Sequence, residues 1–360
     1  MKILNIIDIP WHSALAAYAF DQSAALAGRG HDIFFAAPEN SAAAAFARAN
    51  GFPLTLIPSR NNYLLLGALL RLKRLVEIES IDVVNAHTGK AQSMARLLSL
   101  ISSRPFALVR TKADARRPRN GFALGKAALV IAGSGNIKKM YTAAGVTPGR
   151  IEVIYQGIIP PPGQPRAANH EPRAAGPGGP LKVGILGRLD PVKGHACFVK
   201  AAALVLKKAP DTEFLIAGRE ENVKYAALET LAKKLGIADK VKYLGHVPDK
   251  FAFIRSCDMG VIASLSSEAV SRAALEWLAA GKPLVASSVG GLPEFAAEEW
   301  LVPPEDPAIL AEKLLTLLGS PEKRLAAGAD GRAKVFRDFS PAAFAERTEA
   351  VFKKAVTGDR

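Results

Sequence analysis

Two cations flank a short loop in the second half of the chain, in the stretch GRLDPVKG. Gly187 and Gly194 free the backbone for a tight turn. Arg188 and Lys193 lie between a predicted strand and a predicted helix, where backbone amides and the positive end of the helix dipole also attract anions. This combination is typical of a diphosphate site, although solvated charges on an ordinary turn are the alternative. The stretch matches neither the P-loop nor the G-x-G-x-x-G pattern, so ATP hydrolysis and simple NAD binding lose support.

Two glutamates, Glu268 and Glu276, are separated by seven residues. On one continuous helix they would lie more than about 10 Å apart along the axis. We therefore predict that a helix begins between them, so that Glu268 lies in a loop and Glu276 in the helix. A carboxylate can accept hydrogen bonds from the vicinal hydroxyls of ribose. Two surface glutamates are the alternative, but Glu276 stands between Leu275 and Trp277, where a random charge is less expected.

Short apolar runs alternate with helical patterns in both halves of the chain. Continuous apolar strands that alternate with helices indicate an α/β fold with doubly wound parallel sheets. Ligands of such sheets bind beyond the carboxyl ends of the strands. Strands are predicted at 3–7, 32–36, 54–57, 83–86, 107–110, 130–132, 181–186, 212–217, 241–244, 259–263 and 283–287, and helices at 14–27, 195–208, 224–235, 271–280, 307–318 and 341–355.

Proline and glycine are dense between the two halves, which predicts a linker there. A chain of 360 residues suits two domains of ordinary size. We expect a first domain at 1–160, a linker at 161–180 and a second domain at 181–340. The final helical stretch, 341–360, is expected to pack back on the first domain.

The composition is that of a globular protein, with 49% apolar and 22% charged residues. Cys197 and Cys257 belong to no CxxC or Cys/His cluster, so a disulfide framework and a structural zinc site are not expected, and a reducing cytoplasm fits. No apolar run has the length of a transmembrane helix. The opening MKILNIIDIP predicts a buried strand and not a signal peptide.

The formal net charge of +14 is concentrated in the first half, which holds 21 Lys/Arg against 10 Asp/Glu. It is densest at 104–126, where Arg110, Lys112 and Arg116 are expected to follow a strand end and to contact an acceptor phosphate or lipid headgroups. A merely basic surface is the alternative. The amphipathic stretch 63–76 could lie on a membrane, but packing on the sheet is the favoured expectation.

The two glutamates, with AAGKPLVASSVGGLPE after them, resemble the hallmark of retaining glycosyltransferases of family 4. GRLDPVKG resembles the donor-diphosphate loop of that family, and LAGRGHDIFFAAP, IDVVNAHTGKAQSMA and VIYQGI resemble further segments, so that the similarity covers most of the chain. The resemblance implies the GT-B fold, with two Rossmann-like domains facing each other across a cleft. It also implies transfer of a sugar from a nucleotide-diphosphate sugar, with retention of configuration.

The resemblance assigns roles to the matching residues. Arg188 and Lys193 would hold the donor diphosphate and stabilise the leaving group, and Glu276 would bind the ribose. Glu268 would hold the transferred sugar, and His87 falls on the second histidine of an H-A-H motif, where an active-site histidine is expected. Further donor contacts are implied for Gly187, Gly218, Arg219, His246, Val247, Val270, Ser271 and Arg272.

The chain departs from the family pattern at several positions. Near the first strand, Trp11, His12 and Ser13 stand where the family often has Gly-Gly, so this segment is expected to line the acceptor pocket. Asn85 replaces the first histidine of H-A-H, and Gln156 replaces an asparagine. Ser271-Arg272 replaces a Phe-Gly type pair. None of these changes removes the residues expected to contact diphosphate or ribose.

No aspartate-rich metal motif follows a predicted strand, so we expect a metal-independent donor site with no cofactor. The expected partners are a nucleotide-sugar donor and an anionic saccharide or lipid-linked acceptor, for example in lipopolysaccharide or envelope polysaccharide synthesis. The expected location is cytoplasmic, with peripheral contact to the inner face of the membrane. A nucleotide-sugar epimerase of the same fold is one rival. A basic nucleic-acid-binding module is another, but its aromatic stacking platforms are missing at 7% aromatic residues. A homologue with a dead site is a third.

Overall fold

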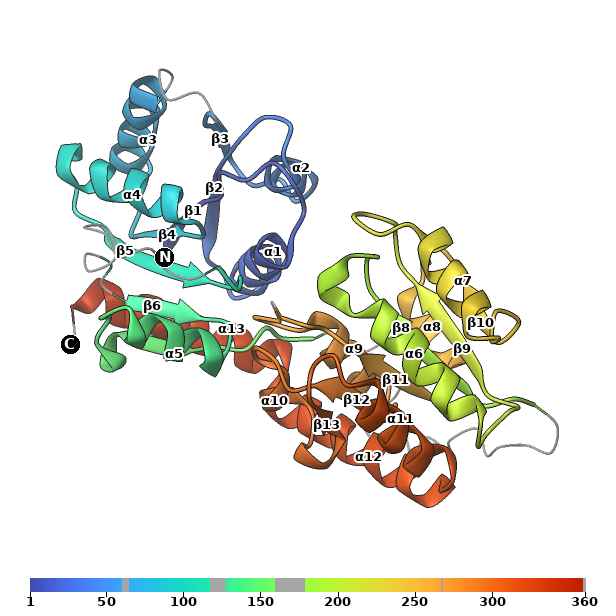
Figure 1. Ribbon diagram of the computed structural model, residues 1–360. Coiled ribbons are helices and arrows are strands. Elements are labelled where there is room, and N and C mark those ends of the chain that lie inside the picture. Colours follow the sequence, from blue (N-terminus) through green and yellow to red (C-terminus); the bar gives the residue numbers. More distant parts are fainter. Residues whose placement is uncertain (60–64, 117–126, 128, 159–178, 267, 359–360) are drawn as a thin grey trace. The chain divides into compact units, whose positions relative to one another are not determined.

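The computed structural model describes residues 1–59, 65–116, 127, 129–158, 179–266 and 268–358 (Figure 1). The chain divides into two compact units, one of Met1–Gly157 with Phe339–Arg360, and one of Ile158–Asp338. The linker predicted at 161–180 lies outside the described residues, apart from Gly179 and Pro180. Each unit is built on one parallel sheet.

The first unit has a seven-stranded sheet in the order β3-β2-β1-β4-β5-β6-β7. Its strands are β1 (Lys2–Ile6), β2 (Asp32–Ala37), β3 (Leu54–Leu56), β4 (Val83–Ala86), β5 (Ala107–Lys112), β6 (Leu129–Ala132) and β7 (Ile151–Val153). Its helices are α1 (Ala14–Ala27), α2 (Ala42–Ala49), α3 (Leu65–Ile78), α4 (Gly89–Ile101), α5 (Gly135–Ala143) and α13 (Pro341–Thr357).

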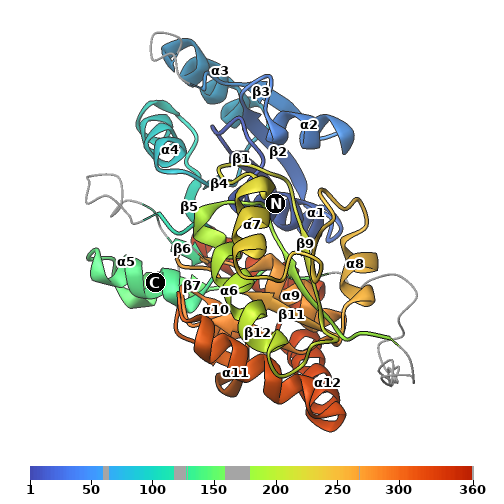
Figure 2. The ribbon, with the colours of Figure 1, turned by 45° about the vertical axis from the view of Figure 1, so that its right-hand side comes forward.

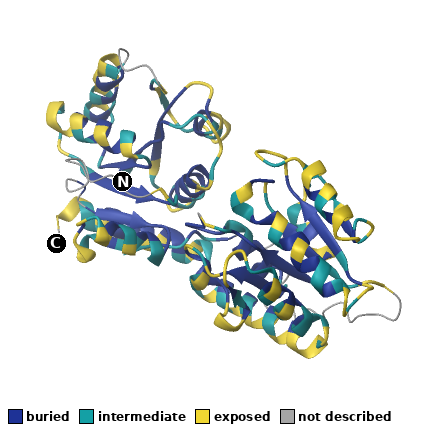
Figure 3. Ribbon diagram, viewed as in Figure 1, coloured by how far each residue is buried: buried dark blue, intermediate teal, exposed yellow. Residues whose placement is uncertain are grey.

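Alternate residues of these strands serve the two faces of the first sheet, as the period of a strand requires. Leu4 and Ile6 of β1 pack with α3 and α4, whereas Asn5 points to the other face, toward α1. The helix α13 packs on α1, where the rings of Tyr18 and Phe344 meet edge to face at 5.1 Å. The last helix of the chain therefore completes the core of the first unit (Figure 3).

The second unit has a six-stranded sheet in the order β10-β9-β8-β11-β12-β13. Figure 2 labels β9, β11 and β12 of this sheet. Its strands are β8 (Lys182–Leu186), β9 (Glu213–Ala217), β10 (Val241–Tyr243), β11 (Met259–Ile262), β12 (Leu284–Ser287) and β13 (Leu301–Val302). Its helices are α6 (His195–Leu206), α7 (Tyr225–Lys234), α8 (Lys250–Ser256), α9 (Arg272–Ala279), α10 (Leu292–Phe295), α11 (Pro307–Leu318) and α12 (Pro321–Asp338).

One face of the second sheet packs with α6 and α11. On the other face, Trp277 of α9 lies so close to β11 that a Cβ at Gly260 would come within 2.3 Å of its ring. A side chain at this strand position would push α9 away from the sheet. Gly260 thus fixes the depth at which α9, and with it Glu276, is seated.

The predicted strands and helices are confirmed, with ends that shift by one or two residues. One shift matters, because β5 continues to Lys112 through its pairing with β6. The prediction that Arg110 and Lys112 follow the strand end was therefore wrong. Both lie inside β5 and are buried, with 3% and 4% of their surfaces exposed.

Candidate functional site

Five loops meet at the carboxyl edge of the second sheet. The loop after β8 bonds to the loop after β9, where the Leu189 amide donates to Arg219 at 2.7 Å. It also bonds to the loop after β11, where the Leu265 amide donates to Val192 at 2.8 Å. Further contacts join the loops after β9 and β10, and those after β11 and β12. Residues that are far apart in the sequence are thereby held at one sheet edge.

Two glycines make this close approach possible. Gly194 has φ of +69°, and a Cβ on it would lie 1.8 Å from the backbone oxygen of Ala263. Gly218 has φ of +154°, and a Cβ there would lie 1.8 Å from the backbone oxygen of Gly187. The neighbours are backbone atoms that cannot rotate away, so both positions require glycine.

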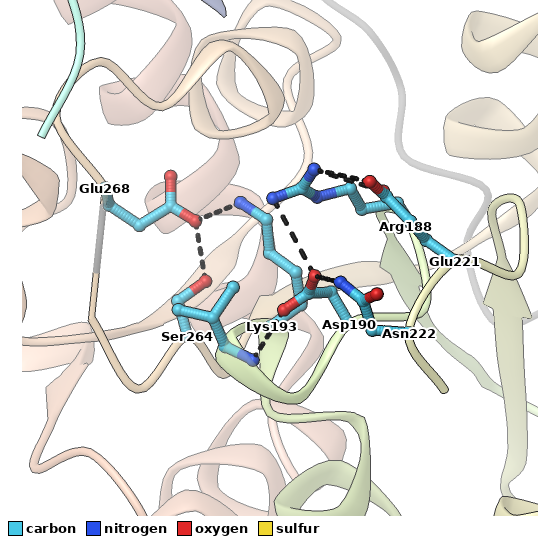
Figure 4. A network of polar contacts seen from close by, with 8 residues as sticks. Arg188, Asp190, Lys193, Glu221, Asn222, Ser264 and Glu268 are labelled. Carbon is cyan, nitrogen blue, oxygen red and sulfur yellow. Dashed lines mark hydrogen bonds and ion pairs between the residues drawn. The ribbon is translucent and has the colours of Figure 1, made fainter. Parts of the chain in front are cut away.

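The two predicted diphosphate cations each contact a carboxylate (Figure 4). Lys193 Nζ lies 2.5 Å from Oε1 of Glu268. Arg188 Nη1 lies 3.1 Å from both carboxylate oxygens of Glu221. About half of the Arg188 side chain is exposed, so this cation can exchange its partner at little cost.

Asp190 shapes the loop that carries both cations. Its carboxylate accepts from the Val192 amide at 3.0 Å and from Asn222 Nδ2 at 2.7 Å. Burial alone would raise the pKa of Asp190, but these hydrogen bonds and the nearby cations outweigh it, so the pKa is lowered. The aspartate therefore stays ionised and holds the turn at Pro191–Lys193.

Glu268 is buried, with 4% of its surface exposed, and it lies in the loop after β11 as predicted. Its Oε1 accepts from Ser264 Oγ at 2.6 Å as well as from Lys193. No hydrogen bond from the described residues reaches its Oε2. The carboxylate thus has one oxygen fixed by the protein and a second one available to a ligand hydroxyl.

Glu276 lies in the second turn of α9, which begins at Arg272, so the predicted helix start between the two glutamates is confirmed. It is buried to the same degree as Glu268. Its Oε1 accepts from Arg272 Nε at 3.2 Å and from Lys250 Nζ. Sequence reasoning missed Lys250, Glu221, Asn222 and Ser264. All four lie within a few positions of a predicted site residue, but no local pattern shows which charges they contact.

The other predicted donor residues lie at the same edge of the second unit. Arg219 Nη2 lies 3.5 Å from His246 Nε2, and both side chains are exposed. Ser271 is buried and precedes α9 without a side-chain capping bond. Gly187 follows β8, Val247 is half-buried and Val270 is buried. The structure therefore groups the donor-site residues predicted in the second half beyond the ends of four neighbouring strands, β10, β9, β8 and β11.

His87 lies in the first unit and has no exposed surface. Its Nε2 is 3.0 Å from Asn5 Oδ1 and 3.1 Å from Asn85 Nδ2. Asn85 in turn contacts Gln22 and Thr111, so the ring belongs to a buried polar network. Burial, together with the positive charge of Arg110, lowers the pKa of His87 to about 3. The ring is therefore neutral at physiological pH.

The predicted acceptor residues differ from one another in exposure and in the contacts that they make. Trp11 is half-exposed, whereas Ser13 caps α1 by accepting from the Ala16 amide at 3.2 Å. His12 packs edge to face on Phe20 at 6.0 Å. Arg110 Nη1 donates to the backbone oxygen of Ala86 at 3.0 Å, Lys112 pairs with Asp114, and Arg116 is exposed. Within β5 the two buried cations are thus satisfied by the protein itself.

The described part of the chain holds neither a metal cluster nor a membrane-spanning helix. Within it, His, Cys, Asp and Glu side chains form no group of three or more that could hold a metal ion. None of the helices there combines the length and the apolar character needed to cross a bilayer.

Comparison with known families matches both halves of the chain. Residues 15–160 match the model described as glycosyltransferase family 4, and residues 180–320 match that of glycosyl transferases group 1. The chain belongs to glycosyltransferase family 4. Its fold is accordingly GT-B, with two Rossmann-like units on parallel sheets.

Among curated relatives, a D-inositol 3-phosphate glycosyltransferase of Corynebacterium efficiens is 34% identical over 226 residues, which are 59% of this chain and 53% of the relative. An MMP alpha-(1->4)-mannosyltransferase of Mycolicibacterium hassiacum is 30% identical over 235 residues, 63% of this chain and 54% of the relative. The chain thus spans about half the length of the curated relatives that it matches.

Solved structures share the fold of this chain over nearly its whole length. Anabaena Alr3699/HepE in complex with UDP superposes with a TM-score of 0.82 at 21% identity, covering 98% of this chain and all of the other. The apo form of the lipopolysaccharide outer core galactosyltransferase WaaB gives 0.79 at 14% identity, with both chains fully covered. At these identities the likeness concerns the fold alone.

Proposed function

We propose that this chain transfers a sugar from a nucleotide-diphosphate sugar to an acceptor hydroxyl, and that the donor binds at the carboxyl edge of the second sheet. The observation that carries the proposal is the convergence of Arg188, Lys193 and Glu268 at that edge. The names of the curated relatives as glycosyltransferases support it, as does the UDP bound by Alr3699/HepE.

The donor diphosphate would replace Glu221 at Arg188 and would join Glu268 at Lys193. The diphosphate carries more negative charge than Glu221. The exposed pair of Arg188 with Glu221 contributes only about 0–1 kcal/mol, so Arg188 can exchange Glu221 for a donor phosphate at little cost. Lys193 bonds Glu268 with one of three N–H groups and keeps two for phosphate oxygens. Glu268 would then present Oε2 to a hydroxyl of the donor sugar.

The proposed reaction retains the anomeric configuration. The bond from the anomeric carbon to the diphosphate oxygen breaks, and a bond from that carbon to the acceptor oxygen forms on the same face. The acceptor proton passes to the departing phosphate. Negative charge grows on the diphosphate in the transition state, where positioned cations contribute most. Arg188 and Lys193 supply these charges, and we propose that the donor site needs no metal. Unchanged turnover after treatment with EDTA would agree with this.

The proposed acceptor is an anionic saccharide or a lipid-linked saccharide, including those of lipopolysaccharide or envelope polysaccharide synthesis. The excess of 21 Lys/Arg over 10 Asp/Glu in the first 180 residues supports an anionic acceptor. Relatives named for inositol 3-phosphate point to a phosphorylated acceptor as well. Arg116 is the exposed cation of the predicted acceptor set.

We also propose peripheral contact with the inner face of the cytoplasmic membrane, through the outer side of two helices. Of the twelve large apolar side chains exposed in the described part of the chain, seven lie on β3, α3 and α4. Arg71 and Arg74 lie among them on α3, and cations beside exposed apolar groups suit an anionic lipid surface. We call the six helical members the α3–α4 surface: Leu66, Leu70, Ile78, Leu97, Leu100 and Ile101.

The proposed activity is tested by a thermal-shift screen against UDP-, GDP- and ADP-sugars, followed by product analysis. A ligand that binds only the folded chain raises Tm, so one of these donors should do so. With that donor and an acceptor, a glycosylated acceptor is expected. A sugar epimerised from donor alone would favour the epimerase instead. Retention on DNA without any response to nucleotide sugars would favour the nucleic-acid-binding alternative.

A further inference from the structure

The buried carboxylate of Glu276 is held by two cations that both contact the same oxygen. Lys250 Nζ and Arg272 Nε donate to Oε1, the latter at 3.2 Å. The Glu276 side chain is 6% exposed, against 38% for Lys250 and 42% for Arg272. The acid is thus buried while both cations reach the surface.

The positions of these cations are not explained by the helices that carry them. Lys250 is the first residue of α8 and Arg272 the first of α9. The positive end of the helix dipole disfavours a cation in the first turn, where acids are the usual residues. Neither first turn contains an acidic residue. The contact with Glu276 supplies a negative partner for a cation at each of these positions.

The geometry leaves one side of the carboxylate open. A carboxylate oxygen has two lone pairs, and the two cations occupy both on Oε1. Within the described chain, Oε2 accepts no hydrogen bond. The Lys250 ammonium uses one N–H on Glu276 and has two others. A hydroxyl placed beside the pair can donate to Oε2 and accept from Lys250, so that it contacts both members of the pair.

We propose that Lys250 is a positioning residue of the nucleotide site, which fixes Glu276 so that Oε2 faces a ribose hydroxyl. The inference rests on the proposed function, because it needs a nucleotide donor at this edge of the sheet. The inference goes beyond the proposed function because it names a residue, 26 positions away from Glu276, that determines how strongly a ribonucleotide is preferred over its 2′-deoxy counterpart.

A purely structural role for Lys250, as neutraliser of a buried acid, predicts different behaviour. Loss of the cation would then lower the stability of the fold and would weaken ribo- and 2′-deoxyribonucleotides alike. The positioning role predicts a change in their ratio. The discrimination between the two ligands is therefore the informative quantity.

The test is isothermal titration of the full chain with UDP, GDP and ADP and with their 2′-deoxy counterparts. For the diphosphate that binds, wild-type protein should favour the ribonucleotide on the order of tenfold or more, as expected for a hydrogen bond to a charged group. Lys250→Met should remove most of this ratio, and Lys250→Arg should restore it. Lys242→Met is the matched control, since Lys242 forms a similar half-exposed pair with Glu213 at 2.5 Å on the far strand β10.

Two further variants separate the proposed function from the proposed role of Lys250. They are Glu276→Gln and the double variant that combines it with Lys250→Met. If no diphosphate binds wild-type protein, the proposed function fails. If Glu276→Gln loses the discrimination but Lys250→Met keeps it, only the role of Lys250 is overturned. Because Lys250 is proposed to act through Glu276, the double variant should match Glu276→Gln alone, and additive losses would contradict the proposal. Should Lys250→Met fail to fold, Lys250→Gln provides the same comparison.

Discussion

At the scale of single residues, most charges at the carboxyl edge of the second sheet pair with residues that are distant in sequence, as in Arg188–Glu221, Lys193–Glu268 and Lys250–Glu276. The spacing of Arg188, Lys193, Glu268 and Glu276 made these four predictable, because they sit in two short stretches with distinctive patterns. Their partners were not predictable, since Glu221 is 33 residues from Arg188 and no local pattern connects them. Burial of Arg110 and Lys112 was also hidden, because a charged residue at a strand end gives the same pattern whether the strand stops before it or includes it.

Two buried histidines give the folded chain a defined response to acid. Burial lowers the pKa of His87 to about 3 and, with the charge of Lys193 adding to it, that of His195 to about 4. Between these values and the usual 6.5, the unfolded chain binds more protons than the folded one. Their contribution to stability is therefore full above pH 6.5 and is lost as pH falls, at about 1.4 kcal/mol per pH unit for each histidine.

This response is measured by urea unfolding of wild-type protein and His87→Gln between pH 7.5 and pH 5, a range chosen to bracket the usual histidine pKa of about 6.5. The free energy of unfolding should fall more steeply for wild-type protein as the solution is acidified, because the variant lacks one of the buried rings whose pKa is lowered. Identical slopes for the two proteins would show that His87 does not titrate as its burial requires.

At the scale of elements, the predicted strands are the most secure part of the sequence reasoning, since short continuous apolar runs bounded by turn residues are typical of buried strands. The edge strand β13 was missed because two residues are too few to form a pattern. The edge strand β7 was missed as well, although it is as long as the predicted strands β3 and β10. The way in which the loops at the carboxyl edge of the second sheet contact one another could not be derived from the sequence either. It depends on backbone contacts such as that between Leu265 and Val192, which no side-chain pattern records.

The contact between Gly194 and Ala263 gives a prediction for the loop that carries the cations. Gly194→Ala places a methyl group 1.8 Å from a backbone oxygen in addition to a left-handed φ. Gly236→Ala is the control, with φ of +71° and nothing within 4 Å of its Cβ. Urea unfolding should show a loss of about 1 kcal/mol for the control and a clearly larger one for Gly194→Ala. Equal losses would mean that the loops after β8 and β11 do not need the close approach of Gly194 to Ala263.

At the scale of the whole molecule, the net charge of +14 and the exposed apolar groups of the first unit support the proposal that the chain binds the surface of an anionic membrane. The sequence predicted that 63–76 packs on the sheet, and Ala68, Leu72 and Val76 of α3 do so. It did not show that the same helix also carries apolar side chains outward. The contact with lipid headgroups predicted for 104–126 falls in part on residues 117–126, which lie outside the described residues.

Membrane contact through the α3–α4 surface is tested by co-sedimentation with vesicles of phosphatidylglycerol and phosphatidylcholine. Leu70→Ser combined with Ile78→Ser should reduce binding on the order of tenfold, from the lost burial of apolar groups. Leu325→Ser, an exposed leucine of α12 in the second unit, should leave it unchanged. Added salt should weaken binding as the arginines are screened. If the double variant sediments like wild-type protein, the α3–α4 surface is not the contact.

The central claim is that Arg188 and Lys193 act on the departing diphosphate, and turnover of alanine variants tests it most directly. With the donor identified by thermal shift, kcat of Arg188→Ala and of Lys193→Ala should fall by about 10²–10³, the usual effect of removing one electrostatic stabiliser. Lys242→Ala, which removes a paired cation on β10, should turn over like wild-type protein. If kcat of both site variants equals that of the control, the diphosphate is bound elsewhere and the account is wrong.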